Sequence, residues 1–141
     1  MASPSQQPQQ AAANTVLARI ANQSQIEFEL DFFTSLLDRR PDFVEALKAH
    51  AKNLAIARRH QEGLQCDRRI TRLRPQDSLA RYNLACSLAL TRHFDEALLE
   101  LRNAVELGYR DFNFMKQDRD LDPIRKDPRF RAIVREYERK R

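Results

Sequence analysis

The apolar residues of the first forty positions recur three or four apart, which is the spacing of an amphipathic helix. After the first three of these apolar residues comes a denser apolar stretch, residues 26–37. We interpret the segment as two helices, the second ending before Pro41, because the residue before a proline disfavours helical backbone. Residues 1–14 are rich in Gln, Ala, Ser and Pro. They predict a disordered tail or a frayed lead into a helix. The first apolar positions are Val16, Leu17 and Ile20.

Further along, the pattern repeats with a period of 34 residues. Pro41 and Pro75 are 34 apart, and sliding the chain by this distance without a gap aligns nine further identical pairs between residues 46–73 and residues 80–107. Such regular spacing predicts a duplicated unit of two antiparallel helices. The pairs are Ala46 with Ala80, Ala51 with Ala85, Leu54 with Leu88, Ala55 with Ala89, Arg58 with Arg92, Glu62 with Glu96, Leu64 with Leu98, Arg68 with Arg102 and Leu73 with Leu107.

Each unit divides around a short polar turn, "RRHQ" in the first and "TRHF" in the second. The first helix of each unit is expected to begin at a capping Asp42 or Asp77. Gly108 follows the second unit as a helix stop. The predicted ends are Ala57 and Leu90 for the first helices, and Leu73 and Leu107 for the second helices.

Small residues are predicted where the two helices of a unit approach each other. Ala51 is expected to face Gly63, and Ala85 to face Ala97. A larger side chain there would hold the backbones apart.

A 34-residue hairpin with Leu-Ala in its first helix, an aromatic residue and Asp-Glu-Ala opening its second, and Pro between units resembles the tetratricopeptide repeat. The segment "NLACSLALTRHFDEALLELRNAVEL" matches closely. In the preceding copy His60 replaces the aromatic residue, Gly63 the alanine and Asp67 an apolar residue. The stretch ending at Pro41 is similar to a third, degenerate copy. The resemblance covers residues 15–110 and implies an all-α solenoid of stacked helical hairpins.

Residues 111–141 depart from the repeat and are predicted to form a helical cap. Asp111, Asp122 and Asp127 are each interpreted as helix N-caps, the last two followed by proline. The segment "DLDPIRKDPRF" resembles the closing element of many bacterial tetratricopeptide proteins. Stacked repeats need such an element to shield their last apolar face. The apolar stripe of the final helix is Phe130, Ile133, Val134 and Tyr137.

The resemblance also implies that the first helices of the hairpins line a concave groove. We expect a non-catalytic adaptor or co-chaperone-like module that holds a peptide or a partner helix in this groove. The implied groove positions are Glu45, Lys48, Ala49, Lys52, Ala55 and Ile56 in the first clear repeat, Leu79, Tyr82, Asn83, Cys86, Ala89 and Leu90 in the second, and Asn113, Lys116 and Gln117 in the cap.

One tetratricopeptide sub-family binds the acidic C-terminal tail of heat-shock chaperones with a clamp of Lys and Asn. Lys48 and Asn83 match two clamp positions, whereas Lys52 replaces an Asn. Asn113 and Gln117 stand where two basic residues belong. Because Lys48 and Lys52 are neighbours on one face, we expect the ligand to be an acidic or mixed peptide. The alternative is an ordinary solvated helix face without a dedicated ligand.

The chain has a formal net charge of +5, and the segment "ARRHQEGLQCDRRITRLR" and the terminal "RKR" are rich in Arg. Clustered Arg could contact nucleic-acid phosphates or an acidic protein, which is the second functional hypothesis. No aromatic residue for base stacking lies in the longer stretch, and exposed backs of second helices are commonly charged. A base-composition bias of the source genome would produce the same excess of Arg.

Catalysis and metal binding have little support in the sequence. His50, His60 and His93 lie far apart in the repeat scheme, and Cys66 and Cys86 lack the spacing of metal ligands. With two glycines in the chain, a phosphate-binding glycine loop is excluded. We expect both thiols to be free and at least half-buried, and Cys86 to be inert. The prediction is no enzymatic activity, no cofactor and no metal.

No apolar run approaches the roughly 20 residues that span a bilayer, and the N-terminus lacks the features of a secretion signal. We therefore expect a cytoplasmic protein that does not associate with membranes. The cluster of Phe28, Phe32 and Phe33 raises a third hypothesis, a self-associating scaffold subunit. The prediction is a monomer or a weak homodimer, depending on whether the N-terminal helix covers this cluster.

Overall fold

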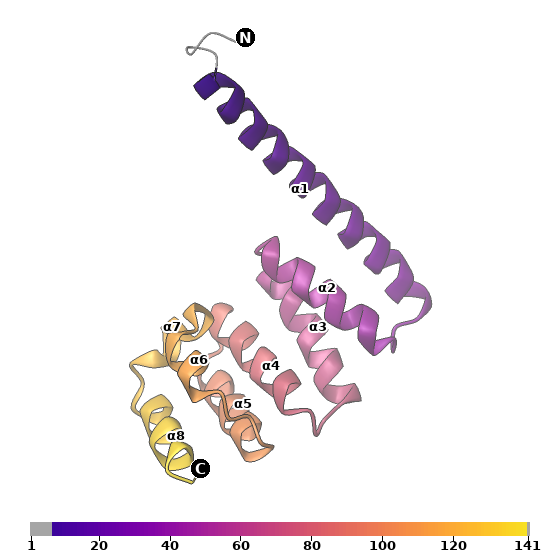
Figure 1. Ribbon diagram of the computed structural model, residues 1–141. Coiled ribbons are helices and arrows are strands. Elements are labelled where there is room, and N and C mark those ends of the chain that lie inside the picture. Colours follow the sequence, from indigo (N-terminus) through magenta and orange to yellow (C-terminus); the bar gives the residue numbers. More distant parts are fainter. Residues whose placement is uncertain (1–6, 141) are drawn as a thin grey trace.

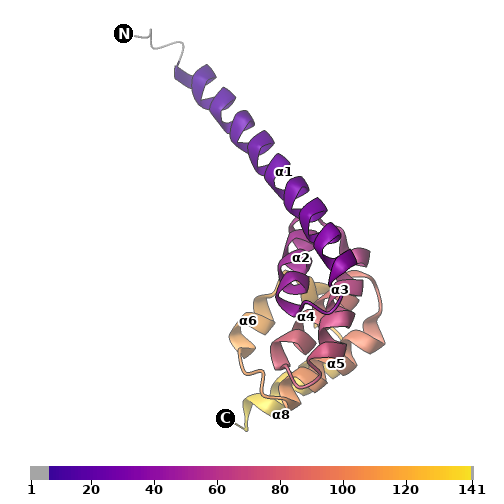
Figure 2. The ribbon, with the colours of Figure 1, turned by 90° about the vertical axis from the view of Figure 1, so that its right-hand side faces the viewer.

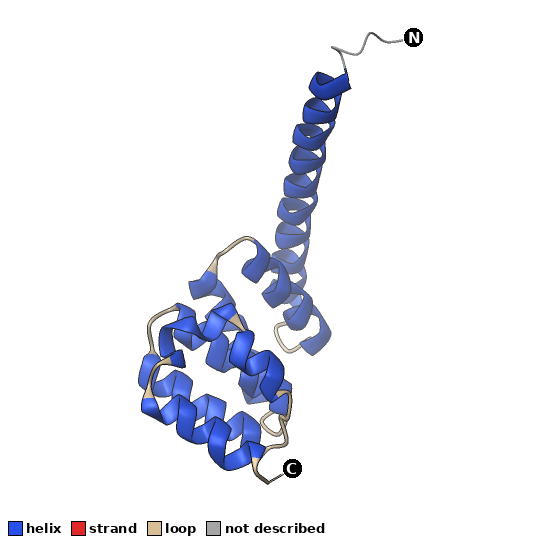
Figure 3. Cartoon of the chain, turned by 60° about the vertical axis from the view of Figure 1, so that its left-hand side comes forward, coloured by secondary structure: helices blue, strands red, loops and turns tan. Residues whose placement is uncertain are grey.

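The computed structural model describes residues 7–140, and this part of the chain is all helical (Figure 1). Figure 3 shows how short the loops between the helices are. In chain order the elements are α1 (Gln7–Arg39), α2 (Val44–Ile56), α3 (His60–Leu73), α4 (Ser78–Leu90), α5 (Phe94–Glu106), α6 (Phe112–Gln117), the 3-10 helix η1 (Arg119–Leu121), α7 (Asp122–Arg125) and α8 (Pro128–Glu138).

Each helix packs mainly on its neighbours in the chain. The end of α1 packs on α2, α2 pairs with α3, α3 lies against α4, and α4 pairs with α5. The C-terminal elements then cover the second pair, with η1 and α7 against α4 and α8 against α5. The predicted duplicated hairpins are therefore present as α2–α3 and α4–α5.

The duplication extends to the backbone of the turns. Arg58 and Arg92, 34 residues apart, both have positive φ, at 58° and 68°. After each of them the next amide donates back into the first helix, Arg59 to Leu54 and His93 to Leu88. The same left-handed conformation ends α5 at Gly108, with φ at 116°. The predicted glycine stop is thus confirmed, and arginine takes the same conformation at the two internal turns.

Helix capping follows the prediction at some aspartates and not at others. Asp77 accepts from the amides of Leu79 and Ala80, and Asp111 and Asp127 cap α6 and α8. The prediction for Asp42 was wrong, because Phe43 is the N-cap residue of α2 and makes no side-chain cap. Asp122 was also assigned wrongly. It is the first residue of α7, and its carboxylate contacts Arg125 instead of capping.

The N-terminal segment differs from the prediction of two helices. It forms one helix, α1, of 33 residues. Residues 9–39 hold no Gly or Pro, so no local signal stops the helix once it has begun. Of the predicted tail, residues 1–6 lie outside the described residues and residues 7–14 belong to α1. Figure 2 shows that most of α1 extends away from the other helices.

The buried side chains form two apolar clusters, which overlap at α3 and α4, since Leu64 of α3 belongs to the C-terminal cluster and Ala80 of α4 to the N-terminal one. The N-terminal cluster joins Leu30 and Leu37 of α1 to Leu47, Leu54 and Ile70 of the first hairpin. The C-terminal cluster is larger and unites the second hairpin with the cap. Its fully buried members from the cap include Phe112, Met115, Leu121, Ile124 and Ile133.

The small residues expected between the helices of the second hairpin lie in the core. Ala85 and Ala97 are completely buried. At Gly63, however, a Cβ would lie 3.9 Å from the Cβ of Leu54, an ordinary contact, so the prediction that no larger residue fits was wrong there. In the described part of the chain, no helix has the length and apolar character needed to cross a membrane.

Candidate ligand groove

A groove with a cavity volume of about 520 Å³ runs between α2 and α4. Residues of α3 form its floor, and the α6–η1 segment closes one end. Of the residues predicted to face a groove, it brings together Lys48, Lys52 and Ala55 of α2 with Leu79, Tyr82, Asn83, Cys86 and Leu90 of α4.

One wall of the groove is basic. Lys48 and Lys52 lie one turn apart on α2, and both are exposed. Arg59 and His60 continue this wall at the turn into α3. Lys48 is 3.9 Å from the carboxylate of Glu45, an exposed pair that holds the lysine only weakly. The ammonium groups of this wall are therefore available to an anionic group.

On α4 the predicted residues divide into exposed and buried ones. Asn83 and Leu79 are exposed, and Leu90 is half-buried. Tyr82 is only 2% exposed, and Cys86 is also buried. Both side chains line the groove as expected, but little of their surface is exposed. Their helical spacing was right, but the cap segment lies over them.

Tyr82 is held by the C-terminal segment. Its hydroxyl donates to the Asp118 carboxylate at 2.6 Å, and its ring stacks on Tyr109 with centroids 4.2 Å apart. Burial, the neighbouring Cys86 and the bond to Asp118 all raise the pKa of this phenol, so it stays protonated. Tyr82 thus holds Asp118 in place at the end of the groove.

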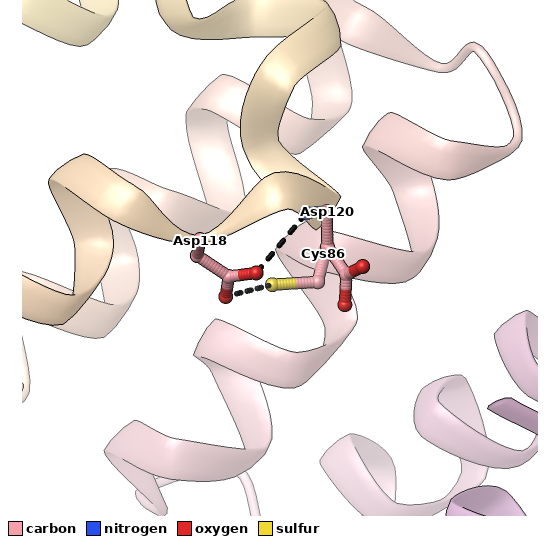
Figure 4. A group of neighbouring side chains, drawn as sticks. All are labelled: Cys86, Asp118 and Asp120. Carbon is pink, nitrogen blue, oxygen red and sulfur yellow. Dashed lines mark hydrogen bonds between the residues drawn. The ribbon is translucent and has the colours of Figure 1, made fainter. Parts of the chain in front are cut away.

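The groove end brings Cys86 together with Asp118 and Asp120 (Figure 4). The Cys86 thiol lies 3.7 Å from a carboxylate oxygen of Asp118, and the other oxygen of Asp118 accepts from the amide of Asp120 at 3.0 Å. One sulfur and two carboxylate ligand atoms lie within 4.8 Å of one another.

This sulfur and oxygen set is of a kind that divalent cations bind. Both Asp118 oxygens, however, already accept hydrogen bonds from Tyr82 and from the Asp120 amide. Burial and the two carboxylates raise the pKa of the Cys86 thiol well above its ordinary value. The arrangement is therefore a hydrogen-bonded network that gives the groove end an acidic character.

Asp67 is a further acid of the groove, on its floor. It is buried on α3, and the hydroxyl of Ser87 on α4 donates to it. Burial raises its pKa to about 6, which the bond from Ser87 opposes. The sequence held a signal for it, since Asp67 stands 34 residues before the apolar Leu101.

Sequence reasoning did not assign Asp118 and Asp120 to the site. The acidic pair in "KQDRDLD" was the available signal, but the resemblance pointed to the helix before it. Seven residues expected at the groove lie outside its lining: Glu45, Ala49, Ile56, Ala89, Asn113, Lys116 and Gln117. Lys116 instead contacts Glu138 of α8, with 2.9 Å between nitrogen and oxygen.

Several arginines of the basic stretch have partners within the chain. Arg68 makes two hydrogen bonds, of 2.7 and 2.9 Å, to Glu96 of the second hairpin. Arg59 contacts Glu62, and Arg69 donates to the carbonyl of Pro41. The Arg68 bonds join α3 to α5, the Arg59 contact lies within the first turn of α3, and the Arg69 bond ties α3 to the loop before α2. Part of the arginine excess therefore has a structural use.

Both cysteines are free and buried, as predicted. Burial raises the pKa of the Cys66 thiol to about 11. His50 is packed beside Phe33, and desolvation and nearby arginines lower its pKa. His60 lies in the groove lining, whereas His93 contacts the Thr91 hydroxyl.

No protein-family profile matches the chain. A stretch of 61 residues is 31% identical to a chloroplastic protein of Arabidopsis thaliana. The match covers 43% of this chain and 18% of the plant protein. It is a local similarity to part of a longer protein.

Proposed function

We propose that this chain is a tetratricopeptide-like repeat module that binds a segment of a partner protein in the groove between α2 and α4. The repeated hairpins with matching turns at Arg58 and Arg92 support this assignment of the repeat type. The role is that of an adaptor without catalytic activity, with the cytoplasm as its predicted location.

The observation that carries the proposal is the opposite charge of the α2 wall and the cap end of the groove. Lys48 and Lys52 stand on α2, and Asp118 and Asp120 at the cap. Exposed apolar side chains, Leu79 and Phe114, lie in the same lining. A segment of mixed charge fits these walls, with an acidic residue toward the lysines and a basic residue toward the aspartates.

The state of Cys86 supports a binding role over a catalytic one. A nucleophilic thiol needs a depressed pKa and a neighbouring base. Burial and the adjacent carboxylates shift the pKa of Cys86 in the opposite direction.

The test begins with selection of random peptides on the immobilised protein, followed by calorimetry with the selected peptides. Lys48→Ala with Lys52→Ala should weaken binding of acidic peptides at least tenfold, or about 1.4 kcal/mol. Asp120→Asn should weaken binding of peptides that carry a basic residue. Lys126→Ala with Lys140→Ala is the matched control, since both lysines are exposed and outside the groove lining.

If the selected peptides bind the groove variants as tightly as they bind the unaltered protein, the groove is not their binding site. Retention of RNA or DNA in low-salt filter binding, without any peptide selected, would favour the Arg-rich surface instead.

A further inference from the structure

Helix α1 carries five large apolar side chains that face solvent. Val16 is 53% exposed, Leu17 63%, Ile20 54%, Phe28 69% and Phe32 53%. These residues, called here the α1 stripe, extend over more than four turns of one helix. Monomeric proteins rarely leave such an extended apolar surface without a use.

The α1 stripe lies on the side of the helix opposite to its packed face. At 3.6 residues per turn, the five positions fall within one half of the helix circumference. The other half holds the residues that pack toward α2, with Leu30 and Leu37 buried and Ile26 and Phe33 partly buried. The stripe is therefore a second apolar surface, separate from the core.

Residues 14–25 of α1 have little support from the rest of the described chain. Every side chain described from residue 14 to residue 25 is exposed, and Figures 1 and 2 show this part projecting beyond α2. Helices of this kind draw most of their stability from packing of an apolar face. A partner that covers the stripe would supply this packing.

We propose that the partner is a second copy of this chain, and that two α1 helices pair antiparallel through their stripes. At these exposures each side chain offers roughly 100 Å². Two facing stripes then bury on the order of 1,000 Å², which reaches the size of a specific interface.

The distribution of side chains along α1 favours the antiparallel orientation. A pair centred on Ser24 sets Ile20 against Phe28, and Val16 against Phe32, so aliphatic side chains meet aromatic ones. Glu27 and Asp31 lie on the same side of the helix as the stripe, and in a parallel pair each would face its own copy. In the antiparallel pair centred on Ser24, Glu27 lies opposite Ala21 and Asp31 opposite Leu17, so neither carboxylate faces a like charge.

The test is the molar mass of the full chain by light scattering and sedimentation equilibrium over roughly 1–200 µM, because interfaces of this size can associate weakly. The unaltered chain should approach the mass of a dimer as its concentration rises. Leu17→Glu with Ile20→Glu should shift the dissociation constant at least tenfold toward monomer. The matched control is Ala18→Glu with Asn22→Glu on the opposite face, which adds the same charge and should leave the dimer intact.

Disulfide trapping tests the orientation separately. Ser24→Cys, at the centre of the pair, should form an intermolecular disulfide on mild oxidation. Asn14→Cys should not, because the two Asn14 positions would lie roughly 30 Å apart in the antiparallel pair. A chain that stays monomeric over the whole concentration range, or a dimer that the stripe variant leaves unchanged, would overturn the proposal. Rapid trapping through Asn14→Cys would overturn the antiparallel arrangement.

Discussion

The hydroxyl of Tyr82 donates a hydrogen bond of 2.6 Å to the carboxylate of Asp118, 36 residues later in the chain. Tyr82 belongs to α4, whereas Asp118 lies between α6 and η1. The bond therefore fastens the C-terminal segment to the second hairpin and fixes the acidic end of the groove.

Tyr82→Phe should lower the free energy of unfolding by about 1–2 kcal/mol, because the half-buried Asp118 loses a donor. Urea denaturation measures this change. The control is Tyr137→Phe, whose hydroxyl bonds Glu106 at the exposed surface, and which should cost less than about 0.5 kcal/mol. Equal losses in the two variants would mean that the Tyr82 bond is no stronger than a surface contact.

Asp67 should make stability depend on pH. Its pKa is raised from 3.8 to about 6 by burial, so the folded state binds its proton more tightly than the unfolded state does. The associated stability is fully present below about pH 3.8 and is lost as the pH rises through 6. The loss is on the order of 3 kcal/mol at neutral pH.

Asp67→Asn keeps the shape and an acceptor for Ser87 while it removes the charge. It should raise the free energy of unfolding at pH 7.5 by on the order of 1–3 kcal/mol and change it little at pH 4. Urea denaturation of both proteins at the two pH values checks this. A variant that is less stable than the parent at pH 7.5 would show that the carboxylate is favourably bound in its ionised form.

Glycine at the two left-handed arginines should stabilise the fold. Arg58 and Arg92 have φ of 58° and 68°, where a Cβ costs about 1 kcal/mol. Arg58→Gly and Arg92→Gly should each raise the free energy of unfolding by about 0.5–1 kcal/mol, measured by urea denaturation. Gln65→Gly, at an exposed position in the middle of α3, is the control and should lower it by about 1 kcal/mol. A loss of stability in the turn variants would mean that the arginine side chains make contacts that outweigh backbone strain.

The two thiols should react slowly while the chain is folded. Burial raises the pKa of Cys66 to about 11 and that of Cys86 well above its ordinary value. At pH 8 their reaction with a thiol reagent should be about 100-fold slower than in urea. The Cys66→Ser and Cys86→Ser variants assign any fast phase. One rapidly reacting thiol in the folded chain would place that cysteine in a more open or more basic environment.

The hairpins were predictable because their signals are local. The 34-residue period located both units, and the ends at Leu73 and Leu90 agree with the structure. Asp77 and Gly108 mark helix ends through the backbone groups next to them, which a short stretch of sequence contains.

The groove end was less predictable because distant segments build it. The spacing along α4 predicted that Tyr82 and Cys86 share the face of the helix that lines the groove. Their burial, however, depends on Asp118 and its neighbours in the cap. In α1 the first apolar positions and the denser apolar stretch from residue 26 were interpreted as two helices, although the polar residues 22–25 between them include no Gly or Pro. A polar stretch without Gly or Pro does not interrupt a helix, and here it only separates parts of one exposed face.

The length of α1 sets the distance between the two grooves of the proposed dimer. A helix of 33 residues is roughly 50 Å long, and its packed end holds the first hairpin. Antiparallel pairing of two such helices would place the repeat bodies at opposite ends of a rod. A partner with two suitable segments, joined by a linker that spans this distance, would then be held by avidity, whereas a shorter linker would allow only one segment to bind.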